Sequence, residues 1–322
     1  MPRLTVVIPA YNESAVLAAF HARLSKVLGQ LPMTCEVLYV DDGSRDDTWL
    51  IMQSLAAADP QVGTLKLSRN FGKEAALTAG LDRVDADAAI VIDADLQDPP
   101  ELIPQLVEQW QAGYDVVYAT RSARAGETSL KRFTAAAFYR TMDIMSDVAV
   151  PRDTGDFRLL SRRALAALAQ LRERQRFMKG LFAWIGYRQT SITYLRSPRL
   201  AGRSKWNYWR LAQFAIEGIT SFSSAPLKLA TWTGMAASLS AFLFGLKVLL
   251  KALLRGDPVP GYPSLMVVIL FLGGIQLLAL GVIGEYLGRN YNESKQRPLY
   301  FIEEDHPPAS QAPLHTEATR QS

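Results

Sequence analysis

The chain has 322 residues, of which 49% are hydrophobic and 20% charged, and this length suits one large domain or two ordinary ones. The formal net charge of +4 fits phosphorylated ligands or anionic lipid. No helix-turn-helix, zinc-finger or ribonucleoprotein motif is present in the sequence, so we expect no nucleic-acid partner. Cys35 is the single cysteine, which excludes an intrachain disulfide and any multi-cysteine zinc site.

Short apolar segments alternate with helical patterns over the first 228 residues. The apolar segments predict strands at residues 4–8, 36–40, 64–67 and 88–92. The helical patterns fall at residues 14–28, 48–58 and 73–84. Nearly continuous apolar strands separated by helices indicate an α/β domain with a mainly parallel sheet. In such sheets ligands bind at the carboxyl ends of the strands.

The strongest local pattern is a pair of carboxylates directly after the fourth predicted strand. Asp93 and Asp95 are two residues apart, so in extended chain their side chains project to the same side. Mg²⁺ or Mn²⁺ would take such oxygen ligands together with phosphate oxygens and neutralise a leaving diphosphate. Gln97 offers a further oxygen. The alternative interpretation is a solvated strand end, because acidic pairs are common in loops.

The first and second predicted strands also end in polar clusters. Tyr11 follows the first strand and is suited to contact a nucleobase. Asp42 follows the second strand and is suited to accept hydrogen bonds from a ribose or base, while Gly43 permits a tight turn. The alternative for each cluster is a helix cap, for example by Asp47. Three polar clusters at one sheet edge together indicate a single nucleotide pocket.

Two segments, residues 229–254 and 264–287, are predicted as transmembrane helices. Each contains about 20 largely uncharged residues, which at about 1.5 Å per residue matches a hydrocarbon core of about 30 Å. The alternative is a pair of buried core helices in a soluble domain. Lys and Arg residues on the flanks of the pair favour a catalytic domain on the cytoplasmic face of the inner cell membrane.

The predicted organisation places a cytoplasmic catalytic domain at residues 1–205 and an amphipathic juxtamembrane helix at residues 206–228. This helix has two equally supported interpretations, lying in the membrane interface or packing on the catalytic domain. Residues 288–322 form a cytoplasmic tail. From Glu303 onward the tail is rich in Pro, Ala, Gln and Thr, which predicts disorder.

Three motifs together resemble the signature of family 2 glycosyltransferases with the GT-A fold: Val7–Glu13, Val40–Ser44 and Asp93–Pro100. Within that family, Ser68–Lys73, Asp153–Leu160 and the two apolar segments are similar to the polyprenyl-phosphate glycosyltransferases. The resemblance covers roughly residues 4–300. It implies a GT-A, Rossmann-like nucleotide-sugar domain followed by a two-helix transmembrane hairpin.

The resemblance also implies roles for individual residues. The residues implied to bind the nucleoside are Pro9, Tyr11, Glu13, Val40 and Asp42. Those implied to hold the diphosphate and a Mg²⁺ or Mn²⁺ ion are Asp93, Ala94, Asp95 and Gln97, with the metal ligands being Asp93, Asp95 and Gln97. Arg121 would lie near the phosphates, and Arg203 and Lys205 match a basic loop that closes over the donor. Two cations there would stabilise a departing diphosphate.

Lys131 and Arg132 match a basic pair associated with the acceptor phosphate, although residues 135–137 are all alanine where a neighbouring serine is expected. Plain surface charge is the alternative for Lys131. Asp156, with Asp95, is the expected catalytic carboxylate, and Asp156 is the usual candidate for general base. A monoalkyl phosphate has a second pKa near 6 and is largely ionised at pH 7, so Asp156 has the alternative task of orienting the acceptor or the sugar.

The function implied is inverting transfer of a hexose, glucose from UDP-glucose, onto a polyprenyl phosphate such as undecaprenyl phosphate, for modification of cell-envelope glycans. The expected partners are the nucleotide-sugar donor, the lipid acceptor, the membrane and further copies of the chain in a homo-oligomer. One alternative keeps the fold and uses GDP-mannose or a UDP-amino-sugar. A processive polysaccharide synthase is disfavoured because residues 173–177 lack the tryptophan of its acceptor motif. The last alternative is a non-catalytic nucleotide-binding membrane scaffold.

Overall fold

The computed structural model describes residues 1–121, 154–174, 176–194, 225–255 and 261–309. The chain divides into two compact units. One is an α/β unit formed by the N-terminal part of the chain, and the segment from Pro298 onward also belongs to it. The other contains two long helices.

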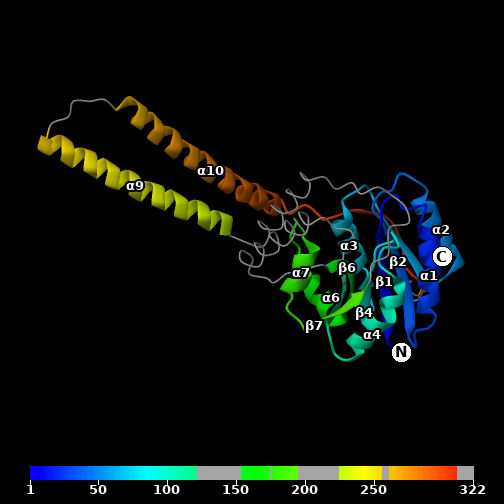
Figure 1. Cartoon of the computed structure of the whole chain (residues 1–322). Coiled ribbons are helices and arrows are strands. Elements are labelled where there is room, and N and C mark those ends of the chain that lie inside the picture. The colour runs from blue at the N-terminus through cyan, green and yellow to red at the C-terminus, as the bar shows by residue number, and fades with distance from the viewer. Residues whose placement is uncertain (122–153, 175, 195–224, 256–260, 310–322) are drawn as a thin grey trace, which may run out of the picture. The chain divides into compact units, whose positions relative to one another are not determined.

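The α/β unit contains eight strands among the described residues (Figure 1). The strands are β1 (Arg3–Ala10), β2 (Thr34–Asp41), β3 (Val62–Leu67), β4 (Ala88–Val91), β5 (Val116–Arg121), β6 (Thr154–Ser161), β7 (Gln189–Tyr194) and β8 (Ile302–His306). Its helices include α1 (Leu17–Leu28), α2 (Thr48–Ala58), α3 (Lys73–Leu81), α4 (Ile103–Gln111), α6 (Arg162–Leu168) and α7 (Met178–Trp184). The four strands and three helices predicted for residues 4–92 are confirmed, with boundaries that differ by a few residues.

One mixed sheet holds all eight strands in the order β7-β5-β6-β4-β1-β2-β3-β8. Strands β4, β1, β2 and β3 are parallel, as the alternation of apolar strands and helices predicted. Strand β6 runs antiparallel between β4 and β5, and β8 runs antiparallel along β3. The carboxyl ends of β1, β2 and β4 therefore meet at one edge of the sheet.

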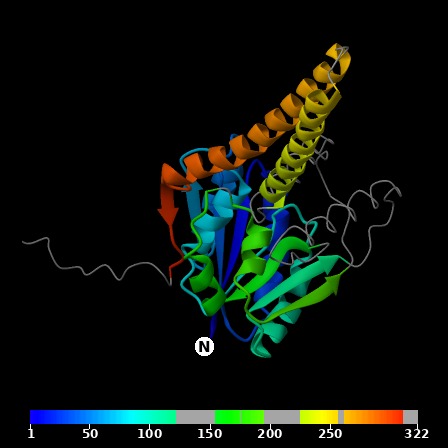
Figure 2. The ribbon, with the colours of Figure 1, turned by 90° about the vertical axis from the view of Figure 1, so that its left-hand side faces the viewer.

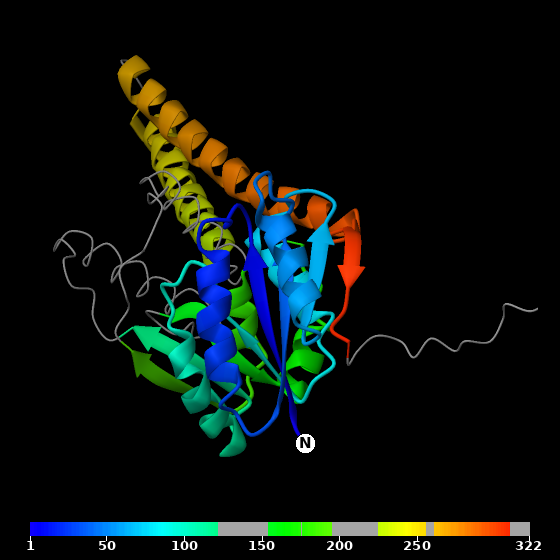
Figure 3. The same cartoon turned by 90° about the vertical axis from the view of Figure 1, so that its right-hand side faces the viewer.

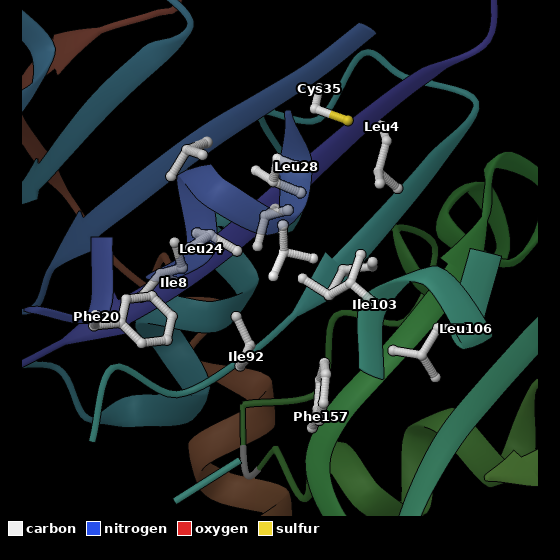
Figure 4. Close-up of a cluster of buried hydrophobic side chains, with 14 of the residues drawn as sticks. Leu4, Ile8, Phe20, Leu24, Leu28, Cys35, Ile92, Ile103, Leu106 and Phe157 are labelled. Carbon is white, nitrogen blue, oxygen red and sulfur yellow. The ribbon is translucent and has the colours of Figure 1, made fainter. Parts of the chain in front are cut away.

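Both faces of the sheet are covered by helices. Helices α1 and α4 cover one face (Figure 3). There the side chains of Phe20 and Leu24 from α1 pack with Ile103 and Leu106 from α4 and with Ile8 of β1 (Figure 4). On the opposite face α3 packs on β1 and β2. A Cβ atom at Gly80 of α3 would come within 2.4 Å of Val7 Cγ1, so only glycine permits this close approach.

The second unit contains α9 (Ala225–Arg255) and α10 (Tyr262–Ser294), which lie against each other (Figure 1). Both are long and apolar enough to cross a membrane, over Leu229–Lys247 and Phe271–Ser294. Large apolar side chains on them are exposed, including Trp232, Phe242 and Leu277. These exposed apolar side chains argue against the alternative interpretation, in which the two helices form the buried core of a soluble domain. Helix α10 continues beyond residue 287, where the predicted second span ends.

The prediction of disorder from Glu303 onward is wrong for the residues of β8. The strand pairs with β3 from Thr64↔His306 to Leu67↔Ile302 and forms one edge of the sheet (Figure 2, red arrow). The Pro-, Ala-, Gln- and Thr-rich composition of the tail predicted disorder, but an edge strand is held by backbone hydrogen bonds that any residue other than proline can make. Residues 310–322 lie outside the described part of the chain, as do residues 206–224 of the predicted juxtamembrane helix.

Candidate active site

A cavity of about 260 Å³ opens at the carboxyl ends of β1, β2 and β4. Its lining brings together the three polar clusters that the sequence placed at strand ends and adds residues from the start of α3. The lining residues are Pro9, Ala10, Tyr11, Glu13, Asp42, Asn70, Gly72, Lys73, Ala76, Asp93, Ala94 and Asp95. Seven of the residues predicted to hold a nucleotide-sugar therefore line one cavity: Pro9, Tyr11, Glu13, Asp42, Asp93, Ala94 and Asp95.

The loops after β1 and β2 are tied to each other by side-chain hydrogen bonds. Asn12, which has a left-handed φ of 56°, accepts a hydrogen bond from the backbone N–H of Arg45 at 2.8 Å. The backbone N–H of Glu13 donates to Thr48 Oγ1 at 2.9 Å. Asp47 is the N-cap residue of α2 but makes no side-chain cap hydrogen bond, and the two contacts fix Asn12 and Glu13 relative to the segment after β2.

Asp42 fixes a third loop. Its two carboxylate oxygens accept hydrogen bonds from the backbone N–H groups of Phe71 at 2.7 Å and Gly72 at 3.0 Å. Burial raises the pKa of Asp42 above its ordinary value, and these two hydrogen bonds oppose that rise. Gly43 has a φ of 68°, and a Cβ there would lie 2.6 Å from the carbonyl carbon of Arg69. Residues 69–72 are therefore seated directly on the turn that follows β2.

Lys73, the first residue of α3, joins two carboxylates. Its ammonium group donates to Asp93 at 2.7 Å and to Asp156 Oδ2 at 2.5 Å. Asp156 lies here because of the register between β4 and β6. The two strands are antiparallel and Val91 pairs with Arg158, so residue 156 lies opposite residue 93. Asp156 does not itself line the cavity, but Lys73 connects it to the wall that Asp93 forms.

The pKa values of Asp93 and Asp156 are shifted in opposite directions. Burial raises the pKa of Asp93, and the ammonium of Lys73 only partly opposes this rise. Burial acts in the same direction on Asp156, but Lys73 and Lys179 outweigh it and hold its pKa at about 2. Asp156 is therefore ionised at neutral pH. Its Oδ1 atom is buried and accepts no hydrogen bond from the described residues.

Two further charged residues support this cluster. The guanidinium of Arg158 is buried, lies 3.8 Å from the ring centroid of Phe182 and donates to the carbonyl of Gly155 at 2.8 Å. Burial lowers the pKa of Arg158 to about 10. Burial and the nearby charge of Asp156 raise the pKa of Glu74 to about 7. The site thus gathers acidic and basic groups from β4, α3, β6 and α7.

The segment after β4 has an unusual backbone. Leu96 has a φ of 60° although it is a buried, non-glycine residue, and this conformation is costly outside glycine and asparagine. It turns the chain so that the backbone N–H of Gln97 donates to Asp95 Oδ1 at 3.1 Å. Gln97 is buried and is absent from the lining of this cavity, so the structure connects it to Asp95 through its backbone.

The carboxylates fit a hard divalent cation. Asp93 and Asp95 both line the cavity and supply the oxygen ligands that Mg²⁺ and Mn²⁺ prefer. Among the residues that the structure describes, no group of three His, Cys, Asp or Glu side chains could hold a metal by itself. A metal here would therefore need ligands from elsewhere, and the phosphates of a nucleotide are the natural source.

Other predicted site residues lie elsewhere or outside the described chain. Val40 is fully buried against Gly80 of α3 and is absent from the lining of the cavity. Arg121 is the last residue of β5, paired with Tyr194 of β7. Four predicted residues lie outside the described part of the chain: Lys131, Arg132, Arg203 and Lys205.

The sequence missed Lys73 as a site residue, together with Asn70 and Gly72, which also line the cavity. The motif Ser68–Lys73 was singled out only as a resemblance, with no role given to any of its members. The location of this motif could have identified these residues, because the motif joins the end of β3 to the start of α3 at the same sheet edge as the acidic pair.

A larger cavity of about 620 Å³ lies at the other end of α3 and contains none of the motif residues. Three arginines line it, and each forms an ion pair within the protein: Arg83 with Asp305 at 2.9 Å, Arg162 with Asp85 at 2.6 Å, and Arg172 with Asp82 at 2.7 Å.

Comparison with known proteins identifies the family of the chain. The model of glycosyl transferase family 2 matches residues 5–168. An uncharacterized glycosyltransferase of Synechocystis sp. is 53% identical over 299 residues, which cover 93% of this chain and 94% of that protein. A bactoprenol glucosyl transferase of Shigella phage SfV is 46% identical over 303 residues, covering 94% of this chain and 99% of that protein.

A solved structure, glucosyl-3-phosphoglycerate synthase from Mycobacterium tuberculosis in complex with Mn²⁺, UDP and glucosyl-3-phosphoglycerate, is 20% identical with a TM-score of 0.44. It covers 68% of this chain, and this chain covers 78% of it. The mixed sheet and the sequence relatives together define an enzyme that transfers sugars, with a GT-A-like fold. The chain belongs to glycosyl transferase family 2.

Proposed function

We propose that the chain transfers glucose from UDP-glucose to a polyprenyl phosphate, of which undecaprenyl phosphate is the expected form, at the cytoplasmic face of the inner membrane. The observation that carries this proposal is the cavity where the ends of β1, β2 and β4 meet, with Asp93 and Asp95 in its wall. The acceptor and the sugar are taken from the bactoprenol glucosyl transferases, to which this chain is similar over nearly all its length.

In this proposal the donor lies along the cavity with its nucleoside toward β1 and β2. Tyr11 and Glu13 contact the base and ribose, with Pro9 beside them. Asp42 is proposed to hold the loop and to contact the donor, because both of its oxygens accept backbone hydrogen bonds and its side chain also lines the cavity. Each carboxylate oxygen accepts more than one hydrogen bond, so a donor contact by Asp42 remains compatible with its structural one. Any contact from Val40 would come from its backbone.

Asp93 and Asp95 would hold the divalent cation, with Gln97 placed next to Asp95 by its backbone hydrogen bond. The metal would supply positive charge to the diphosphate as it departs. Arg121 and the basic pair Arg203 and Lys205 are proposed to add charge on the same side, which would favour the leaving diphosphate further. Lys73 keeps Asp93 in place between α3 and β6.

Asp156 is proposed to orient the acceptor or the sugar. Its pKa of about 2 makes it a weak base, and the acceptor phosphate is already largely ionised at pH 7. Asp156 is connected to the cavity wall through Lys73, which it shares with Asp93. Lys131 and Arg132 are proposed to bind the acceptor phosphate. A single in-line displacement at the anomeric carbon would invert its configuration.

Helices α9 and α10 are proposed to span the membrane as a hairpin, which keeps both ends of the pair on the cytoplasmic side. Their exposed apolar side chains support a lipid environment, because water would make this surface unfavourable. A bilayer location would bring a membrane-dissolved polyprenyl phosphate to the enzyme. The homo-oligomer remains a prediction that native mass spectrometry of the detergent-solubilised chain would test.

Lipid products measured by mass spectrometry test the proposal. Full-length protein would be incubated with undecaprenyl phosphate, Mg²⁺ or Mn²⁺, and UDP-glucose, GDP-mannose or a UDP-amino-sugar in separate reactions. We expect a hexosyl polyprenyl phosphate from UDP-glucose. A product from another donor alone would replace the sugar in the proposal, and the absence of any glycolipid with all donors would contradict it.

A further inference from the structure

The segment that follows α10 belongs to the α/β unit and completes its sheet. Strand β8 pairs antiparallel with β3, and the backbone N–H of Ala309 donates to the carbonyl of Pro60 at 2.9 Å. Lys66 of β3 forms ion pairs with Glu303 at 3.3 Å and Glu304 at 3.4 Å. The outer end of the strand is anchored by His306, whose ring stacks on Trp49 of α2 with centroids 6.3 Å apart.

The other end of this segment contacts the loop that leads to the candidate active site. The backbone N–H of Ser68 donates to the carbonyl of Phe301 at 3.0 Å. The rings of Phe301 and Phe71 lie with centroids 6.3 Å apart at an angle of 52°. The guanidinium of Arg69 lies 4.2 Å from the ring centroid of Phe71, so this ring contacts both a cation and a second aromatic ring.

The same loop forms part of the cavity wall. Asn70, Gly72 and Lys73 line the cavity, and Lys73 joins Asp93 to Asp156. From the inner side the loop is held by Asp42, through the backbone N–H groups of Phe71 and Gly72. Phe71 thus connects two contacts: its backbone is bound to the turn after β2, and its side chain to a residue 230 positions later in the chain.

We propose that Phe301 is a positioning residue for the donor site, acting through Phe71 on the loop Arg69–Lys73. The proposal rests on the proposed function, since it assigns this loop to nucleotide-sugar binding. Without the Phe301 ring, the Phe71 side chain loses its aromatic partner, while the contacts of the loop to Asp42 and Gly43 and the ion pairs of Lys73 remain. The loop then samples conformations in which Asn70, Gly72 and Lys73 no longer form the cavity wall, so donor affinity falls.

Three variants of the full-length chain separate positioning from general stability. Phe301→Ala removes the ring, Phe301→Leu keeps an apolar contact, and His306→Ala removes the aromatic contact at the outer end of the same strand. Phe301 and His306 are both exposed, so neither alanine variant opens a cavity in the core.

Two measurements are made on each variant. In the transfer assay, Phe301→Ala is expected to raise the KM for the nucleotide-sugar about three- to tenfold with kcat within about twofold. Phe301→Leu is expected to recover most of this loss, and His306→Ala to resemble the wild type. In hydrogen exchange, Phe301→Ala is expected to lower protection of the Phe71 and Gly72 amides, which His306→Ala leaves unchanged.

Hydrogen exchange and the KM for the nucleotide-sugar test the positioning role and the proposed function independently. Unchanged exchange at Phe71 and Gly72 in Phe301→Ala would overturn the positioning role, whatever the enzyme transfers. An equal rise in KM for Phe301→Ala and His306→Ala would also overturn it, because the strand would then act only through stability. If the wild type transfers no sugar while exchange changes as expected, the proposed function fails and the coupling of Phe301 to the loop stands.

Discussion

The two ends of α3 form cavities of very different character. The larger cavity, of about 620 Å³, lies at the C-terminal end, and the smaller, of about 260 Å³, at the N-terminal end. At the large cavity the arginines are matched to carboxylates, and Asp82 also accepts a hydrogen bond from Tyr300 at 2.7 Å. At the small cavity two carboxylates, Asp93 and Asp156, share the ammonium of Lys73. The proposed site is the smaller of the two cavities, so volume alone does not identify it.

The largest expected effect comes from removing a carboxylate of the small cavity. Asp93→Asn is expected to lower the rate of sugar transfer about 10²- to 10³-fold, because it removes a proposed metal ligand and the partner of Lys73. The assay is glycolipid formation at saturating donor. Asp85→Asn, at the large cavity, is the matched control and is expected to transfer sugar at the wild-type rate. Equal losses in both variants would contradict the distinction between the cavities.

Lys73→Ala tests whether the shared ammonium organises the small cavity. We expect turnover to fall about tenfold or more, because Asp93 and Asp156 are left close together without their common cation. The pKa of Asp156 is expected to rise in this variant, since Lys73 is the first of the charges that hold it down. Full turnover by Lys73→Ala would show that the cluster is incidental to the reaction.

Gly43→Ala tests the close contact between the turn after β2 and the loop Arg69–Lys73 beside the small cavity. An added Cβ would lie 2.6 Å from Arg69 backbone at a φ of 68°, so we expect a loss of about 1–3 kcal/mol in unfolding free energy. Gly186→Ala is the control, because its φ of 67° is the same but its nearest contact lies at 3.7 Å. Thermal unfolding should show the larger decrease for Gly43→Ala, and the reverse order would contradict the close contact.

The smallest expected effect is at the large cavity. Arg172→Met breaks the ion pair with Asp82, but both side chains are reached by solvent, so the stability cost should be below about 1 kcal/mol. Sugar transfer should be unchanged. A clear loss of turnover with normal thermal stability would assign the large cavity a part in the reaction and weaken the contrast drawn between the two ends of α3.

Much of the site was predictable because it follows strand ends. Apolar periodicity located β1, β2 and β4, and the polar residues directly after them had to meet at one edge of a parallel sheet. Tyr11, Asp42, Asp93 and Asp95 were found in this way. Val40 shows the limit of the approach, because membership of a motif did not reveal that its side chain is buried against Gly80 of α3 and does not line the cavity.

Contacts between distant segments were not predictable from local patterns. The pairing of Lys73 with Asp156 depends on β6 entering the sheet antiparallel beside β4, which composition does not specify. Strand β8 was missed for a related reason, since its polar residues 303–306 resemble a disordered tail and its stability comes from pairing with β3. In both cases the position of the segment depends on the strand that it pairs with, and the local sequence of the segment does not specify that strand.

Calorimetric titration of UDP into the full-length chain, with and without Mg²⁺ or Mn²⁺, tests most directly that the paired carboxylates hold a cation and a diphosphate together. We expect metal-dependent binding by the wild type and a loss of that metal dependence in Asp93→Asn. Binding of UDP that is equally tight with and without metal, or unchanged by Asp93→Asn, would contradict the account.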